Sequence, residues 1–265
     1  MKILVCIKQV PDPEGPRDSF AINKDTMRVE PRGIPPVLSL FDENALEAAL
    51  RIKDTYADGV DITVLSMGKR ISNAVLQKAL AVGADELIKV EGDEFDSAKL
   101  DSNSVASALA LAIKKIGTYD LILFGRQSAD WNAGQVGIYV AMELGVPAIT
   151  LARSVEINDK RLKVERVIPN GFETVETSLP AVVVASNEVG ELRYPTMIQR
   201  REAKNKPVIV WECEDIGFQG PANWVIVQKL YPAEIRQREC KMIQGSSPAD
   251  AGKNLAKILK EERII

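Results

Sequence analysis

The sequence predicts an α/β fold built on a doubly wound, mostly parallel sheet. Over residues 1–145, short apolar runs rich in Val, Ile and Leu alternate with segments in which apolar residues recur at helical spacing. Strands that alternate with helices of about ten to fifteen residues form βαβ units and therefore a parallel sheet. After residue 147 apolar and polar residues alternate, which is typical of half-buried strands added to such a sheet.

Buried strands and amphipathic helices are expected in turn along the first part of the chain. The strands occupy residues 2–7, 61–67, 86–90 and 121–124, and the helices about 45–52, 71–81, 101–116 and 136–144. A short hairpin or irregular excursion at 21–30 separates the first strand from the first helix. Ser39 or Asp42 is expected to cap that helix.

The second part of the chain adds strands and then loses its regular pattern. Strands are expected at 150–157, 161–168, 172–177 and 181–185. From residue 187 the composition is mixed and basic, until an amphipathic helix at 250–262. We therefore predict one domain over residues 1–186 and an extended C-terminal arm over residues 187–265 that packs against another chain.

The composition excludes several classes of protein. The formal net charge of −3 gives no electrostatic basis for nucleic-acid binding. No apolar run approaches the roughly 18 residues that a membrane span needs, so no membrane insertion is expected. The cysteines Cys6, Cys213 and Cys240 have no CxxC spacing, which favours reduced thiols and a cytoplasmic protein.

Histidine is absent from the chain. Its absence removes Ser-His-Asp and Cys-His nucleophile pairs and every metal site that uses a histidine ligand. Chemistry near neutral pH then requires a carboxylate, Lys or Cys of shifted pKa, or a bound cofactor. We favour a cofactor and predict neither a catalytic residue nor a metal ligand.

The stretch from Leu121 to Gly137 is the strongest candidate for a binding site. An apolar strand ends at Gly125, a polar loop follows, and small residues lead into a helix. Ligands of open α/β sheets bind at the carboxyl ends of the strands, near helix N-termini that favour phosphate. Arg126 can meet a phosphate charge, although an ordinary polar loop has the same composition. Neither dinucleotide nor P-loop glycine motifs occur, which disfavours a nicotinamide dehydrogenase and a P-loop NTPase.

Five segments, in order, resemble the β subunit of electron transfer flavoprotein. They are residues 5–12 (VCIKQVPD), 41–49 (FDENALEAA), 79–85 (ALAVGAD), 125–137 (GRQSADWNAGQVG) and, over 164–180, VER…ETV…LP. The resemblance implies a Rossmann-like fold of the adenine-nucleotide-hydrolase type for residues 1–186. It also implies that the arm of residues 187–265 wraps a partner α subunit.

The resemblance further implies the cofactors and partners. The α subunit of the heterodimer carries FAD, and the β cleft holds AMP in the housekeeping branch of the family. In the electron-bifurcating branch the β cleft holds a second FAD, which accepts hydride from NADH. One electron then goes to ferredoxin or flavodoxin and one towards an acyl-CoA dehydrogenase, and a quinone oxidoreductase is a further class of partner. The chain is then an electron-carrier subunit rather than a stand-alone enzyme.

The motifs also imply which residues bind the nucleotide. Val136 favours FAD over AMP, because the AMP branch usually has Thr there, whose hydroxyl can hold a monophosphate. The lining residues carried over by motif are Cys6, Ser39, Leu40, Phe41, Asp42, Met67, Gly125, Arg126, Gln127, Ser128, Ala129, Asp130, Trp131, Asn132, Ala133, Gly134, Gln135 and Val136.

A second segment resembles the loop by which these proteins grip dehydrogenases. It comprises Arg193, Tyr194, Pro195, Thr196 and Met197, with Met197 in the place of an apolar anchor. Charges steer such an encounter and an apolar knob docks it. From the residues alone, the alternative is that Met197 packs within the arm.

A protein of a different class also fits the residues. A nucleotide-sensing protein with the universal-stress fold would bind ATP or AMP as a homodimer, without an α subunit and without a redox role.

Overall fold

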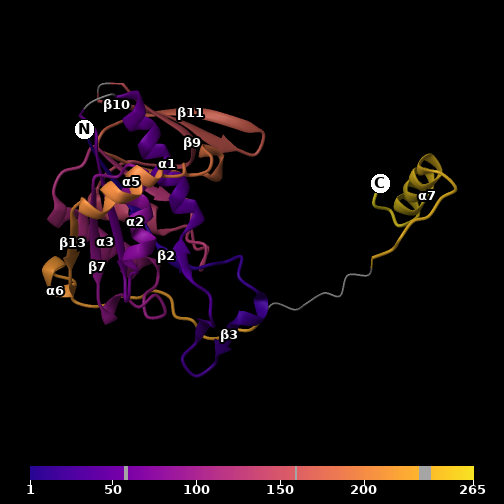
Figure 1. Cartoon of the computed structure of the whole chain (residues 1–265), viewed down its shortest axis with the longest axis horizontal. Helices are drawn as coiled ribbons and strands as arrows, with labels where there is room; N and C mark the ends of the chain where they lie inside the picture. The colour runs from indigo at the N-terminus through magenta and orange to yellow at the C-terminus, as the bar shows by residue number, and fades with distance from the viewer. Residues whose placement is uncertain (57–58, 159, 233–239) are drawn as a thin grey trace. The chain divides into compact units, whose positions relative to one another are not determined.

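The structure is a computed structural model and describes residues 1–56, 59–158, 160–232 and 240–265. The chain forms two compact units, Met1–Leu230 and Tyr231–Ile265 (Figure 1). The first unit contains the sheet and all the predicted binding residues. The second contains helix α7, Pro248–Glu261, where a helix was predicted at 250–262.

A nine-stranded sheet forms the centre of the first unit, in the order β11-β10-β9-β12-β8-β1-β6-β7-β13. The seven strands from β9 to β13 in this order run parallel, and β10 and β11 extend the sheet antiparallel beyond β9. The strands are β1 Lys2–Ile7, β6 Asp61–Gly68, β7 Glu86–Glu91, β8 Leu121–Gly125, β9 Ala148–Asn158, β10 Arg161–Ile168, β11 Gly171–Ser178, β12 Ala181–Ala185 and β13 Val208–Trp211.

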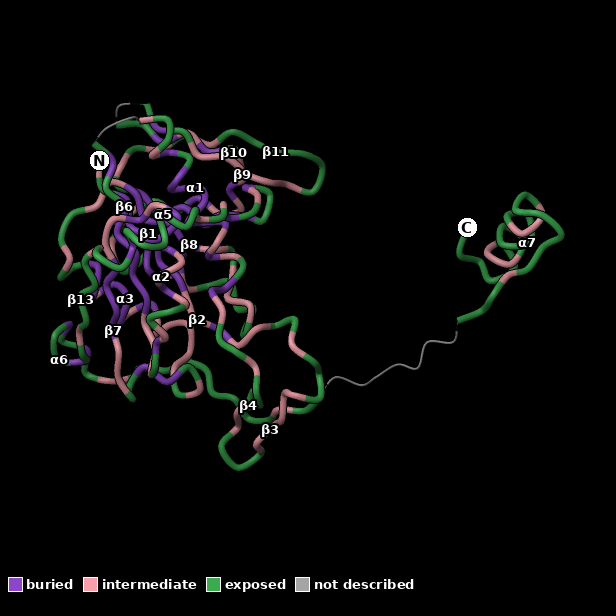
Figure 2. Tube along the Cα trace, viewed as in Figure 1, coloured by how far each residue is buried: buried purple, intermediate pink, exposed green. Residues whose placement is uncertain are grey.

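Helices cover both faces of the sheet. The core between the sheet and α1 and α2 is separate from the core between the sheet and α3, α4 and α6. Buried residues are concentrated in these layers (Figure 2). The helices of the first unit are α1 Leu40–Thr55, α2 Asn73–Val82, α3 Ser102–Ile116, α4 Val136–Leu144, α5 Met197–Glu202 and α6 Cys213–Ile216, with 3-10 turns at Arg17–Ser19, Asp93–Phe95, Asn187–Val189 and Ala203–Asn205.

The predicted fold class is confirmed, and its physical basis is visible in the central strands. Every residue of β12 is buried, as are all of β1 except Lys2, because helices cover both faces of the sheet. A continuous apolar run is therefore the right signature for these strands. In β9 and β10 buried positions alternate with half-buried or exposed ones over part of each strand, as expected for strands with one covered face.

The excursion after β1 forms two small antiparallel pairs. β2 (Gln9–Pro11) pairs with β5 (Pro36–Leu38), and β3 (Phe20–Asn23) pairs with β4 (Arg28–Pro31). The hairpin predicted at 21–30 is thus confirmed. Helix α1 begins at Leu40, earlier than predicted, with Ser39 in the N-cap position. Neither Ser39 nor Asp42 caps it through a side chain, because the Asp42 carboxylate instead accepts the Lys8 N–H at 2.7 Å.

Residues 187–230 contain more structure than their sequence pattern indicated. β13 forms the edge of the sheet beside β7, and α5 packs near α2. The run Val208–Trp211 is four residues long and follows a mixed, basic stretch, so no alternation of strands and helices marked it as a strand. The compact units consequently divide after Leu230 rather than at the predicted residue 187. That residues 187–265 wrap a partner stays a prediction.

Candidate functional site

A cavity of about 590 Å³ lies at the carboxyl ends of the central strands, on the face that α3 and α4 cover. Cys6 of β1, Met67 of β6 and Phe124 of β8 belong to its lining. Along the chain β1 is followed by β6 and β7 on one side, and β8 then lies on the other side of β1. This is the topological switch point, where open α/β sheets bind their ligands.

Asp42 brings a buried carboxylate to this cavity from the first turn of α1. Its side chain accepts the backbone N–H of Lys8, which follows β1. Burial raises the pKa of Asp42 to about 7, although the N–H and the charge of Lys8, the N–H of Gly125 and the Ser39 hydroxyl all act to lower it. Burial, and secondarily the charge of Asp42, raises the pKa of the neighbouring Cys6 thiol well above its ordinary value. Cys6 is therefore a neutral thiol rather than a nucleophilic thiolate.

Gly125 allows α1 to approach the end of β8. A Cβ atom at this position would lie less than 3.0 Å from the carbonyl group of Phe41 and from the carboxylate of Asp42. No side chain larger than hydrogen fits there without moving α1. The glycine thus holds the start of α1 against the cavity.

The loop after β8 is ordered by its own polar contacts. Lys8 Nζ forms an ion pair with Asp130 at 2.7 Å, which ties the loop to the end of β1. Gln127 Nε2 donates to Asn132 Oδ1 at 2.9 Å, and Asn132 adopts a positive φ of 53°. Asp130 and Asn132 are therefore occupied in shaping the loop.

The N-terminus of α4 opens to the cavity without a cap. Gln135 holds the N-cap position, but no side chain there accepts a hydrogen bond from the helix. The first N–H groups of a helix have no partner within it, and together with the helix dipole they attract anions. Val136 begins the helix and lines the cavity, and the exposed Arg126 adds a positive charge to the same lining. The arrangement suits a phosphate group.

The structure brings most of the residues predicted from motifs to one cavity. Those in the lining are Cys6, Asp42, Met67, Gly125, Arg126, Gln127, Ser128, Trp131, Ala133, Gly134, Gln135 and Val136. Those outside it are Ser39, Leu40, Phe41, Ala129, Asp130 and Asn132. Ser39 is fully buried and Leu40 is exposed, so the start of α1 contributes Asp42 to the cavity and not these neighbours.

Sequence reasoning missed several parts of the lining. Met27 comes from the turn of the β3–β4 hairpin, Phe95 and residues 97–103 precede or begin α3, and residues 223–227 come from near the C-terminal end of the first unit. For the residues at the start of α3, the sequence does carry a signal. Asp101 is the N-cap of α3 and accepts the Ser104 N–H at 2.9 Å, a pattern that marks a helix start. Residues 223–227 carry no such pattern.

The predicted docking residues lie outside the cavity lining, before and at the start of α5. Tyr194 and Met197 are exposed by 83% and 78% of their surface, and Ile198 beside them is also exposed. Thr196 and Gln199 form a capping box that fixes the start of the helix. The alternative that Met197 packs within the chain is wrong for the structure described, because its side chain is exposed.

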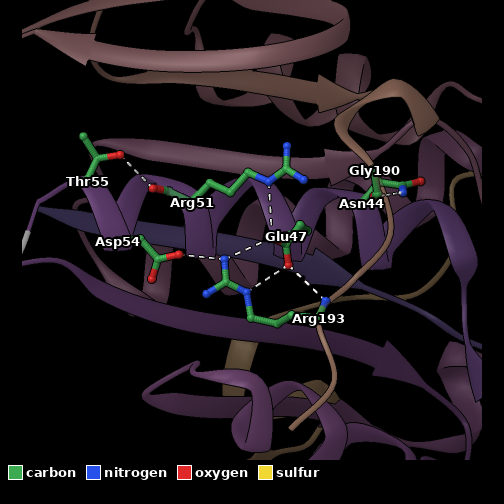
Figure 3. Close-up of polar contacts among 7 residues, drawn as sticks. All are labelled: Asn44, Glu47, Arg51, Asp54, Thr55, Gly190 and Arg193. Atoms are coloured by element: carbon green, nitrogen blue, oxygen red, sulfur yellow. Dashed lines mark hydrogen bonds and ion pairs between the residues drawn. The ribbon is translucent and has the colours of Figure 1, made fainter.

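Arg193 is held by a buried carboxylate from α1 (Figure 3). Glu47 accepts hydrogen bonds from the backbone N–H of Arg193 at 3.1 Å and from its guanidinium at 3.0 and 3.1 Å, while Asp54 pairs with the same guanidinium at 2.7 Å. Burial raises the pKa of Glu47, but the bonds and charge of Arg193 and the bond from Arg51 outweigh burial and lower it. The base of the exposed segment is thereby fixed to α1.

The described residues offer neither a metal site nor a membrane span. Their acidic and cysteine side chains include no cluster of three or more that could bind a metal ion. None of their helices is both long enough and apolar enough to cross a bilayer.

Fold and cavity together define an open, doubly wound α/β protein whose cavity at the switch point has the volume of a small-molecule site. The family model described as "Electron transfer flavoprotein domain" matches residues 26–216. The chain therefore belongs to the electron transfer flavoprotein family, as the sequence motifs predicted.

Curated relatives are similar over all or most of the chain. Subunit CarD of the caffeyl-CoA reductase–Etf complex of Acetobacterium woodii is 34% identical, and the alignment covers all of both chains. The electron transfer flavoprotein subunit beta of Clostridium acetobutylicum has the same identity and coverage. That of Megasphaera elsdenii is 36% identical over 78% of this chain and 77% of its own length.

Proposed function

We propose that this β subunit binds FAD in the cavity at the switch point and carries electrons as part of a heterodimer with an α subunit. The protein contributes cofactor placement, and the flavin contributes the redox chemistry, including acceptance of hydride from NADH. The family membership disfavours the alternative of a universal-stress-like nucleotide sensor, which needs no α subunit.

The observation that carries the proposal is the uncapped N-terminus of α4 beside Val136 and Arg126. It provides N–H donors and positive charge for a phosphate. Val136 has no hydroxyl with which to hold a terminal monophosphate. This absence favours a pyrophosphate ligand, with its further nucleotide extending along the cavity.

The residues present fit such a cofactor. The amide groups at the start of α4 and Arg126 would bind phosphate, and Gln127 and Gln135 offer polar groups to ribose or base. Apolar side chains such as Met67 and Phe124 would contact a ring. The buried Asp42 carboxyl would lie in the same lining, where its charge near neutral pH depends on its neighbours.

We also propose that the exposed segment of Tyr194 and Met197 docks the redox partner, an acyl-CoA dehydrogenase or a similar enzyme. An exposed apolar side chain among Arg200, Arg201 and Lys204 suits a transient encounter. We further propose electron bifurcation as the role, with ferredoxin or flavodoxin, or a quinone oxidoreductase, among the acceptors. The relative named as a subunit of a caffeyl-CoA reductase–Etf complex supports a reductase of a CoA thioester as a partner.

The nucleotide content of the co-purified αβ complex tests the proposal. The complex is denatured, and FAD and AMP are separated by chromatography and quantified by absorbance. We expect two FAD and no AMP per heterodimer. One FAD and one AMP would instead make the chain a one-electron shuttle of the housekeeping type, and an absence of both from the β cleft would refute nucleotide binding.

Val136→Thr tests the proposed reason for the choice of cofactor. The new hydroxyl favours a monophosphate, so FAD in the β cleft should fall towards half of the wild-type amount or less, with AMP in its place. Val136→Ala is the matched control, because it shortens the side chain without adding a hydroxyl. Unchanged flavin stoichiometry in Val136→Thr would contradict this role of Val136.

A further inference from the structure

Residues 223–227, which we call the strap, form part of the cavity wall although they belong to no helix or strand. Trp224 is exposed by 74% of its surface, and Val225 and Ile226 are similarly exposed. Burial of these side chains therefore contributes little to holding the strap in place. The rest of the wall is different, since strand residues such as Leu65 and Phe124 belong to the buried core.

Asp101 holds the strap by its backbone. Its Oδ2 atom accepts the N–H of Trp224 at 2.6 Å and the N–H of Val225 at 3.0 Å. Its other oxygen, Oδ1, accepts the N–H of Ser104 and so caps α3. One carboxylate thus joins the start of a core helix to the strap through charge-assisted hydrogen bonds, which are stronger than those between neutral groups.

Asn223 completes the attachment from the side of the strap. Its Oδ1 accepts the N–H of Asp101 at 3.0 Å and the hydroxyl of Ser104 at 2.8 Å. Its Nδ2 donates to the carbonyl of Lys99 at 2.7 Å. Both the oxygen and the nitrogen of the Asn223 side-chain amide therefore bond to residues just before or at the start of α3.

The strap makes one aromatic contact in addition. The rings of Trp224 and Tyr139 lie 6.2 Å apart, tilted by 55°. Because the attachment consists mainly of hydrogen bonds to a few residues, the strap can open while the sheet and α3 stay folded. Local openings of this kind occur where few apolar contacts must be broken.

We propose that the strap is the movable wall of the cavity, and that Asp101 and Asn223 are positioning residues whose bonds to it set how long a nucleotide stays bound. The proposal rests on the proposed function of the cavity as a nucleotide site. It adds a route of entry and release, and it assigns the control of that route to two residues that touch the strap.

Three variants separate this role from the stability of α3. Asp101→Ser keeps a good helix cap, but its short hydroxyl cannot also reach Trp224 and Val225. Asn223→Ala removes the bonds that the strap makes through this side chain and leaves the cap intact. Asp120→Ala is the control, because Asp120 also accepts a backbone N–H, that of Lys2 at 2.7 Å, but at the opposite end of the sheet.

The αβ complex is purified with its nucleotide, diluted and filtered at timed intervals, and the FAD and AMP in the filtrate are quantified. We expect release from the β cleft to be roughly tenfold faster in Asp101→Ser and in Asn223→Ala, and unchanged in Asp120→Ala. The double variant should release nucleotide at least as fast as the quicker single variant, because the two changes remove different hydrogen bonds of the same attachment. Hydrogen exchange at the Trp224 and Val225 amides should accelerate, while the interior of α3 stays protected.

Wild-type release rates in both variants, together with faster exchange at Trp224 and Val225, would overturn the proposal. A wild-type complex with no nucleotide in the β cleft would instead refute the proposed function. If either variant loses its nucleotide during purification, Ser104→Ala is measured, since it removes only one bond to Asn223. The release rate of Ser104→Ala should then lie between that of the wild type and that of the Asp101→Ser or Asn223→Ala complex after reloading with FAD. A wild-type rate in Ser104→Ala would again overturn the proposal.

Discussion

At the scale of single residues, the most unusual side chain in the cavity is Asp42, because its carboxyl group is buried. A carboxylate that is 7% exposed usually has a cationic partner. Here Lys8, which follows β1, gives its side chain to Asp130 and its backbone N–H to Asp42. Asp42 therefore keeps only part of the stabilisation that a direct ion pair would supply, and burial dominates its pKa.

The raised pKa of Asp42 predicts a pH dependence of stability. Its folded value of about 7 lies above the ordinary 3.8, so the folded chain binds more protons than the unfolded chain between these pH values. The contribution of this group to the free energy of unfolding is largest below pH 3.8. It falls by about 1.4 kcal/mol per pH unit as the pH rises towards 7.

Asp42→Asn should remove this dependence. The difference in melting temperature of the αβ complex between pH 5 and pH 8 should be smaller in the variant than in the wild type. Asp120→Asn serves as the comparison, because its carboxylate also accepts a backbone N–H but lies away from the cavity. Equal pH dependence in wild type and Asp42→Asn would show that Asp42 ionises at an ordinary pH.

At the scale of elements, α1 connects the two candidate functional regions. Its first turn supplies Asp42 to the cavity, and the following turns supply Glu47 and Asp54 to Arg193 at the base of the exposed segment (Figure 3). Glu47 is buried and paired, so removing Arg193 would leave its carboxylate with Arg51 as the remaining cationic partner and would be destabilising. The position of α1 therefore matters to both regions.

Gly125→Ala tests how closely α1 must approach β8. The added methyl group would overlap the Phe41 carbonyl and the Asp42 carboxylate, which requires α1 to shift. We expect a loss of roughly 1–3 kcal/mol in stability, measured by thermal unfolding, and a reduced nucleotide content. Gly68→Ala is the matched control at the end of β6, where the new Cβ would make an ordinary contact with Ile71 at 3.4 Å. Equal losses in both variants would contradict a special role for Gly125.

At the scale of the whole molecule, the sheet separates the proposed binding site from the proposed docking segment. The cavity lies on the face covered by α3 and α4, whereas Glu47 and Arg193 join α1 to the segment before α5, which packs near α2 on the other face. A ligand in the cavity and a partner on the exposed segment would therefore contact different residues. A substitution in the cavity can therefore be tested with the exposed segment intact, and a substitution in the exposed segment can be tested with the cavity intact.

Met197→Ala should weaken docking and leave cofactor content unchanged. We expect the KM of a partner acyl-CoA dehydrogenase for the complex to rise roughly tenfold at constant kcat, since an apolar anchor is lost. Met142→Ala on α4 is the control, because Met142 is exposed by 73% against 78% for Met197. The docking role would be excluded by an unchanged KM, or by an equal rise in the control.

The sequence by itself determined the alternation of strands and helices, and with it the fold class. Buried parallel strands require continuous apolar runs, and β1, β6, β7 and β8 have them, so their bounds were predicted to within one residue at each end. The loop after β8 was identifiable for a related reason. An apolar strand that stops at a glycine before a helix marks the edge where such sheets bind ligands.

Only the tertiary structure decided which distant segments complete the cavity. Met27, Asp101 and the strap meet there through long-range contacts, and no local periodicity encodes a contact between residues 101 and 224. The same holds for β13, whose four residues become a strand because β7 offers them an unpaired edge. Local patterns specify elements, because the period of apolar residues reflects burial. The partners of those elements depend on packing that brings together residues far apart in the chain.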